Sequence, residues 1–221
     1  HPNSRFTAPI SQCPSISNRI DHHHGVLIDA IVFGGRRASV VPLVFESFDW
    51  KHGVFIGATM ASERTAAQFG RQGEVRRDPM AMLPFCGYNM GQYFQHWLDM
   101  GKNMERPPKI FHVNWFRLDE NGKFMWPGFG ENLRVLEWII GRCINTAGSR
   151  LTPIGYIPKA EDLDLSGLSI SGQTVDRLLS VDKEAWIEEA KDIEKFFRTF
   201  GSDLPAELKN QLKKLQERLV I

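Results

Sequence analysis

Cysteine is scarce in this sequence, and the paired arrangement typical of disulfide-rich or CxxC proteins does not occur. The three cysteines are widely spaced and form no CxxC pair, so the chain suits a reducing compartment better than a disulfide framework. No apolar run approaches the roughly 18 residues that span a bilayer. Neither sign of charge dominates, because 27 Lys and Arg face 26 Asp and Glu. The net charge of +1 therefore excludes a field that would draw the whole molecule to nucleic acid or an anionic membrane.

Two kinds of catalytic motif are also missing. No GxxxxGK[ST] phosphate loop occurs, and no pair of cysteines or carboxylates has metal-ligand spacing, so we expect no metal site in this segment. The run His22–His24 is predicted to be a loop, because neighbouring residues on a strand point to opposite faces and the run has no spaced partner ligands. By itself the chain lacks the parts for phosphoryl transfer.

The sequence begins HPNSRF, without an initiator Met and in a stretch rich in Pro, Asn, Ser and Arg. We expect it to be a piece of a longer polypeptide, with any targeting peptide and upstream domain outside it. Its content of 42% hydrophobic and 24% charged residues is that of a globular protein with a sizeable core.

Apolar runs bounded by breakers predict strands. The predicted strands are VLIDAIVF (26–33), which is followed by Gly34-Gly35, GVFIG (53–57), and KIFHVNWF (109–116), which follows two prolines. VPLVFESF (41–48) fits a short helix or a strand equally well. The stretch TMASERTAAQFGR has no apolar stripe, which favours an exposed, movable segment.

Apolar residues at helical spacing predict four helices. They cover 87–101, 132–143, 184–200 and 204–219. Asp182 is a plausible cap for the third, and the last two are expected to form a helical hairpin over about 182–221 that packs against the body. The second helix is expected to turn an apolar face of Leu133, Leu136, Ile139 and Ile140 inward.

The first candidate site is the pair Arg36 and Arg37 after the two glycines, together with Arg5. A guanidinium delivered from a glycine turn at a strand end can form paired hydrogen bonds with phosphate or carboxylate oxygens. The alternative is an exposed turn with solvated charges. Spacing alone does not exclude either one.

The second candidate site is a set of aromatic residues interleaved with glycines. Planar rings presented from loops can sandwich a base, and Asn132 can hydrogen-bond to a base edge. The alternative is an aromatic core cluster, which spacing alone favours because aromatic side chains are mostly buried. The set is Trp115, Phe116, Phe124, Trp126 and Phe129.

Several long sequence motifs resemble those of GTP-dependent phosphoenolpyruvate carboxykinases, both in their residues and in their order, over almost the full chain. These strings are HPNSRFTAPISQCP, IDAIVFGGRR with VPLVFES, HGVFIGATMASE, DPMAMLPFCGYN, PKIFHVNWFR, GKFMWPGFGEN and LTPIGYIPK. The resemblance implies an α/β fold over 1–221, a mixed sheet with covering helices that forms a fragment of the family's mononucleotide-binding C-terminal domain. It also implies a gluconeogenic enzyme that converts oxaloacetate and GTP to phosphoenolpyruvate, GDP and carbon dioxide, with manganese and magnesium as its metals. The implied parent is a monomer, cytoplasmic or mitochondrial, that acts on small molecules and has no nucleic-acid or membrane partner.

Matching motifs imply roles for individual residues. Asn3, Ser4 and Arg5 are expected to contact the carboxylic acid substrate, and Arg5, the catalytic candidate, also to reach the transferring phosphoryl group of GTP. Arg36 is expected to contact the nucleotide phosphates. The guanine pocket is expected from Trp115, Phe116, Phe124, Phe129, Gly130, Glu131 and Asn132. An active-site lid is expected over about 62–73, starting with Ser62, Glu63, Arg64, Thr65, Ala66 and Ala67. Convergent arginines stabilise charge in phosphoryl transfer, and a lid shields the enolate from water.

The chain departs from the family pattern in two ways. Ala38-Ser39 follows GGRR where the family commonly has a proline, and the family's phosphate loop and metal ligands would precede His1. The isolated chain is therefore expected to be inactive, and a sheet cut from its neighbouring strands to have unpaired edges. Two other hypotheses remain: a noncatalytic guanine-nucleotide-binding module, and a helical interaction domain that would need an exposed apolar face within 184–221.

Overall fold

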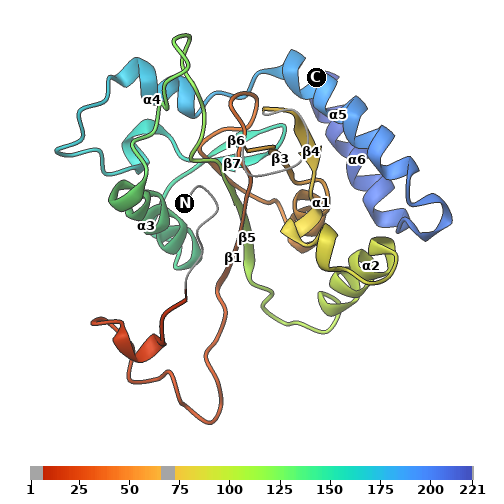
Figure 1. Ribbon diagram of the computed structural model, residues 1–221, viewed down its shortest axis with the longest axis horizontal. Helices are drawn as coiled ribbons and strands as arrows, with labels where there is room; N and C mark the ends of the chain where they lie inside the picture. The colour runs from red at the N-terminus through yellow and green to blue at the C-terminus, as the bar shows by residue number, and fades with distance from the viewer. Residues whose placement is uncertain (1–6, 66–72, 221) are drawn as a thin grey trace.

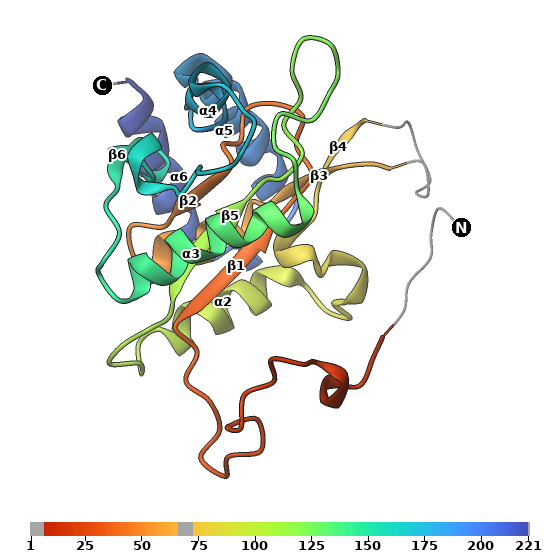
Figure 2. The ribbon, with the colours of Figure 1, turned by 90° about the vertical axis from the view of Figure 1, so that its left-hand side faces the viewer.

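The computed structural model describes residues 7–65 and 73–220. A five-stranded mixed sheet lies between helices on its two faces (Figure 1 and Figure 2). In order across the sheet, the strands are β1 (Ala30–Gly34), β5 (Lys109–Val113), β2 (Val44–Glu46), β7 (Gly155–Ile157) and β6 (Arg150–Thr152). A separate antiparallel pair consists of β3 (Ala61–Glu63) and β4 (Val75–Arg77). This mixed α/β architecture is the predicted one.

Helices cover both faces of the sheet (Figure 1). On one side lies α3 (Asn132–Cys143), and on the other lie α1 (Trp50–Ala58), α2 (Met90–Met100), α5 (Lys183–Arg198) and α6 (Ala206–Val220). The connection from β7 to α5 contains α4 (Gly172–Leu178). Short 3₁₀ helices are η1 (Ile10–Gln12), η2 (Pro79–Ala81), η3 (Leu83–Phe85), η4 (Phe129–Glu131), η5 (Ala160–Asp162) and η6 (Gly201–Asp203).

The strand β1 forms one edge of the sheet and pairs in parallel with β5. Ala30 lies opposite Lys109 and Gly34 opposite Val113, so both strands end at the same side of the sheet. The next strand, β2, runs antiparallel to β5. Within the described residues no other strand pairs with the outer side of β1.

The predicted strand at 53–57 is wrong, because these residues belong to α1. The Asp49 side chain caps this helix by accepting a hydrogen bond from the backbone N–H of His52. Residues 52–58 of the helix are all buried. The sequence therefore lacks the helical alternation of polar and apolar residues from which a helix could be predicted. Gly53 packs on Ile110 of β5, where a Cβ would collide with the isoleucine side chain.

The predicted helix at 132–143 is correct, but its predicted inner face is only partly so. Val135, Trp138 and Ile139 are buried, whereas Leu133 and Ile140 are 66% and 60% exposed. The helix is therefore rotated relative to the prediction, because a short helix with apolar residues on two sides has no unique inward stripe.

The C-terminal helices bury the apolar faces that their periodicity predicts. Trp186, Ile193 and Phe197 of α5 and Leu208 and Leu215 of α6 all belong to the core. The Asp182 carboxylate accepts a hydrogen bond from the N–H of Ala185, which confirms the predicted cap. The two helices contact each other, and α6 also packs on α1. Burial of these faces counts against a helical interaction domain.

The segment from residue 7 to 29 projects from the body (Figure 1), and His22–His24 lie in exposed turns within it. All three cysteines are free thiols, as predicted. Within residues 7–65 and 73–220, no helix combines the length and apolarity needed to cross a membrane.

Candidate functional site

The candidate site lies where the parallel strands β1 and β5 end. Arg36 follows β1 after Gly34-Gly35, and Trp115 and Phe116 follow β5. In open α/β sheets, ligands bind outside the carboxyl ends of the strands. A pocket of about 290 Å³ opens there. Its lining consists of Gly34, Gly35, Arg36, Ser62, Val113, Trp115 and Phe116.

Arg36 lies against an aromatic ring in this pocket. Its guanidinium carbon is 3.9 Å from the centroid of Phe116 and 6.0 Å from that of Phe124. The two rings themselves meet edge to face at 5.9 Å. The predicted phosphate contact and two predicted stacking residues are thus brought together, although they come from three separate parts of the chain.

A buried asparagine that the sequence analysis did not single out connects the two loops. Asn114 is fully buried, and its amide donates to the carbonyls of Arg37 at 2.8 Å and Val41 at 2.9 Å. Its carbonyl oxygen accepts from the backbone N–H groups of Arg37 and Phe116, each at 3.2 Å. A polar residue directly after an apolar strand was the available signal. Asn114 therefore fixes the arginine turn relative to the aromatic loop.

The first residues of the predicted lid hold the arginine turn from its other side. The Arg36 N–H donates to the Ser62 hydroxyl at 3.1 Å, and the Glu63 N–H donates to the Arg36 carbonyl at 2.8 Å. The Glu63 carboxylate accepts from the Ala38 N–H at 2.6 Å. Gly35 permits this approach, because a Cβ there would collide with the Ala61 carbonyl oxygen. Arg36 thus has its backbone fixed by β3.

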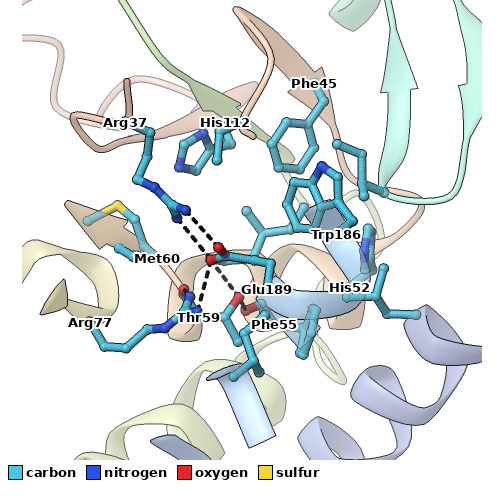
Figure 3. A pocket seen from close by; sticks show the side chains of 16 residues that line it. Arg37, Phe45, His52, Phe55, Thr59, Met60, Arg77, His112, Trp186 and Glu189 are labelled. Carbon is cyan, nitrogen blue, oxygen red and sulfur yellow. Dashed lines mark hydrogen bonds and ion pairs between the residues drawn. The ribbon is translucent and has the colours of Figure 1, made fainter. Parts of the chain in front are cut away.

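Arg37 points away from the pocket into the protein. Its guanidinium makes a bidentate ion pair with Glu189 of α5, with hydrogen bonds of 2.9 and 2.6 Å. Arg77 of β4 reaches the same carboxylate at 2.9 Å and also Asp192 at 2.6 Å. Figure 3 shows both arginines converging on Glu189. This cluster joins the arginine segment after β1 to β4 and α5.

Burial acts against the charges in this cluster, but the pairing outweighs it. Although burial opposes both charges, the hydrogen bond between Arg37 and Glu189 raises the pKa of the arginine and lowers the pKa of the glutamate. Burial, followed by the nearby Arg37 charge, lowers the pKa of His112 to about 4. The cavity among these side chains has a volume of about 40 Å³. Nucleotide-sized ligands need several hundred Å³, so the cluster is structural.

The remaining aromatic residues differ widely in exposure. Trp126 is buried, as the core alternative for it expected, and its indole N–H donates to the Asn132 side-chain oxygen at 2.9 Å. Phe124 is 57% exposed and Phe129 95% exposed. Phe129 also has a positive φ of 49°, a strained conformation that is enriched at functional sites. Phe124 packs edge to face on Phe116, whereas the 95% exposed Phe129 ring makes no ring contact within the described residues.

Not every predicted site residue reaches the pocket. In the described residues no ring contact joins Phe129 to Phe116 or Phe124. Gly130 and Glu131 lie beside Phe129 in η4, where Glu131 pairs with Arg134. Of the predicted lid, the structure describes Ser62, Glu63, Arg64 and Thr65. Asn3, Ser4, Arg5, Ala66 and Ala67 lie outside the described residues.

The implied metal ions have no fitting donor set in this part of the chain. Among residues 7–65 and 73–220, no three His, Cys, Asp or Glu side chains are grouped so that they could hold a metal ion. The acidic side chains nearest the arginine turn, Glu63 and Glu189, already accept hydrogen bonds from the backbone or from arginine. We therefore derive no step through a metal from these residues.

The sheet and the pocket at its strand ends define an α/β domain with a candidate ligand site at the carboxyl ends of parallel strands. The chain belongs to the GTP-dependent phosphoenolpyruvate carboxykinase family, because the family model for the phosphoenolpyruvate carboxykinase C-terminal P-loop domain matches residues 1–218. It is 52% identical over 219 residues to the phosphoenolpyruvate carboxykinase [GTP] of Thermoplasma volcanium, and 51% identical over 221 residues to that of Chlamydia pneumoniae.

These alignments cover 99% of this chain but only 37% of each relative. The chain thus spans little more than a third of the length of the curated relatives that it matches. The strings that carry the resemblance include both loops of the pocket, GGRR and NWF, and the first lid residues. The family match therefore includes every residue of the pocket lining.

Proposed function

We propose that this chain is the guanine-nucleotide-binding part of a GTP-dependent phosphoenolpyruvate carboxykinase. The parent enzyme decarboxylates oxaloacetate and phosphorylates the resulting enolate from GTP, giving phosphoenolpyruvate, GDP and carbon dioxide. The observation that carries the proposal is the convergence of Arg36 and Phe116 at the ends of β1 and β5 in a chain of this family. The same parent acts as a cytoplasmic monomer in gluconeogenesis.

In this proposal each group of the pocket recognises one part of the nucleotide. The Phe116 ring stacks on the guanine, with Trp115 and Phe124 beside it. The stretch from Phe129 to Asn132, which is not part of the pocket lining, contacts the guanine from outside that lining. Arg36 binds the phosphates through charge-assisted hydrogen bonds. Because the Asn132 oxygen already accepts from Trp126, its amide nitrogen is the group that addresses the base edge.

Two further parts of the proposal concern residues around the pocket. The lid extends over about 62–73 and closes over bound substrates, with the β3–β4 pair as its stem. Asn3, Ser4 and Arg5 bind the carboxylic acid substrate, and Arg5 stabilises the transferring phosphoryl group. The ligands for Mn²⁺ and Mg²⁺ come from outside the described residues.

Calorimetric titration of the chain with GDP and with ADP tests the base pocket. We expect GDP to bind more tightly than ADP, and Phe116→Ala to weaken GDP binding by roughly 5- to 150-fold, since a stacked base is worth about 1–3 kcal/mol. Phe85→Ala is the matched control, because this ring is 77% exposed and is not part of the pocket lining. Equal binding of GDP and ADP, or an unchanged affinity in Phe116→Ala, would contradict the proposal.

Catalysis is tested in a chimera that joins the upstream part of the Thermoplasma volcanium relative to this chain. We expect GTP-dependent formation of phosphoenolpyruvate from oxaloacetate, lost in Arg36→Ala through kcat as well as kcat/KM. A chimera that folds and binds GDP without turnover would favour a noncatalytic nucleotide-binding module instead.

A further inference from the structure

The guanidinium of Arg36 occupies the ring surface that a base would need. At 3.9 Å from the Phe116 centroid, it lies at stacking distance, and arginine stacks on aromatic faces as a base does. Both residues line the same pocket at the strand ends. One face of the Phe116 ring is therefore covered by the protein's own side chain.

Only the ring contact holds the head of this arginine. The Arg36 backbone is fixed by Ser62 and Glu63, but in the described part of the chain no carboxylate or carbonyl bonds to its guanidinium. Arg37, by contrast, has both terminal nitrogens on Glu189. The Arg36 backbone is thus fixed while its guanidinium is held weakly, so the side chain can change its rotamer without moving the backbone.

We propose that Arg36 stands in for the nucleobase in the free protein and moves from Phe116 to the phosphates when a nucleotide binds. This inference rests on the proposed function, because it takes Phe116 as the stacking surface. A contact with phosphate oxygens is stronger than an exposed cation–π contact, so the displaced guanidinium gains a better partner only if the ligand carries phosphates.

The exchange gives the pocket a selectivity that neither residue has alone. A nucleoside must displace Arg36 and offers it no new partner, whereas a nucleotide displaces it and then binds it. Recognition of the base and of the phosphates is therefore coupled through one side chain. The strength of an exposed cation–π contact corresponds to about a two- to fivefold penalty on nucleoside binding.

The test compares guanosine with GDP on the chain and on its Arg36→Ala variant, using ligand-observed NMR for guanosine and calorimetry for GDP. We expect guanosine to bind about two- to fivefold more tightly to the variant and GDP to bind more weakly, which are effects of opposite sign. Arg106→Ala is the control for loss of one positive charge. Arg106 is exposed and precedes β5, at the opposite end of the strands, so both affinities should stay unchanged.

Each result separates the two proposals. Suppose that guanosine binds the chain, that Phe116→Ala abolishes this binding, and that Arg36→Ala does not strengthen it. Then Arg36 does not take the place of the base, and the base pocket at Phe116 is supported. If neither ligand binds the chain, both are overturned. A measurement without ligand is independent of these: the Arg36 Hε resonance should show an upfield ring-current shift that disappears in Phe116→Ala and on addition of GDP. An Hε resonance without that shift would also overturn the stand-in role.

Discussion

Two arginines that are neighbours in the chain serve two different regions of the molecule. Arg36 is partly exposed and lies over Phe116 at the rim of the pocket. Arg37 is only 6% exposed and is paired with Glu189 in the interior. Both follow Gly34-Gly35 at the end of β1, and their side chains go to different places: Arg36 to Phe116 and Arg37 to Glu189. Two consecutive residues therefore supply a pocket-lining cation and a structural one.

The difference lies in what balances each charge. In the interior, Arg37 and Arg77 share the Glu189 carboxylate, and Asp192 takes the second side of Arg77. At the rim, a weak aromatic contact is all that the described residues offer Arg36. A buried cation needs a permanent partner, whereas a ligand-binding cation is more useful without one. Substitutions in the two regions should therefore affect different properties.

The largest effect is expected from Arg37→Ala. It leaves the Glu189 carboxylate buried with half of its partners, so the free energy of unfolding should fall by about 3–5 kcal/mol. Arg36→Ala, the matched control in the same turn, should change it by less than about 1 kcal/mol. Urea denaturation followed by far-UV circular dichroism measures both. Equal destabilisation by the two variants would remove the distinction between rim and interior.

The interior should also respond to pH in a way that the rim does not. The pKa of His112 is about 4 in the folded protein, below its unfolded value of about 6.5. As the pH falls from 6.5 towards 4, His112 becomes protonated in the unfolded chain but stays neutral in the folded protein. The free energy of unfolding should therefore drop by up to about 1.4 kcal/mol per pH unit from this group.

Denaturation of His112→Phe at pH 7 and pH 5 isolates that contribution. The aromatic replacement keeps the stacking with Phe45, which lies 5.2 Å away centroid to centroid, and removes the titrating group. We expect a smaller loss of stability on acidification than in the unsubstituted chain, while His23→Gln in an exposed turn leaves the loss unchanged. The same pH slope in His112→Phe as in the unsubstituted chain would show that His112 is not the source.

Sequence periodicity predicted the amphipathic elements and failed where both sides of an element are buried. The helices α2, α5 and α6 each have one apolar face and lie within a few residues of their predicted positions. Helix α1 was missed because residues 52–58 are buried all round, so polarity gives no period. The rotation of α3 was missed because its apolar residues occupy two faces, and only packing against the sheet selects between them.

The sequence pointed to residues that line the candidate pocket, but not to the contacts that hold them together. The strings around Arg36 and Phe116 predicted phosphate and base recognition, whereas Asn114 bonds to Arg37, which lies 77 positions away in the chain, and no local pattern reveals such a contact. Glu189 did leave a signal. It lies three residues after Trp186 and four before Ile193, on the buried stripe of α5, and a carboxylate on such a stripe needs a buried cation.

The smallest effect on stability is expected at the exposed end of the aromatic set. Phe129 is 95% exposed, so Phe129→Ala should change the free energy of unfolding by no more than about 0.5 kcal/mol. Phe94→Ala is the buried counterpart at 0% exposure and should cost about 3–5 kcal/mol. If the Phe129 ring is kept for a ligand, its removal should weaken GDP binding while leaving the denaturation curve in place. A variant that loses stability but keeps its affinity for GDP would instead make Phe129 a packing residue and exclude it from the ligand site.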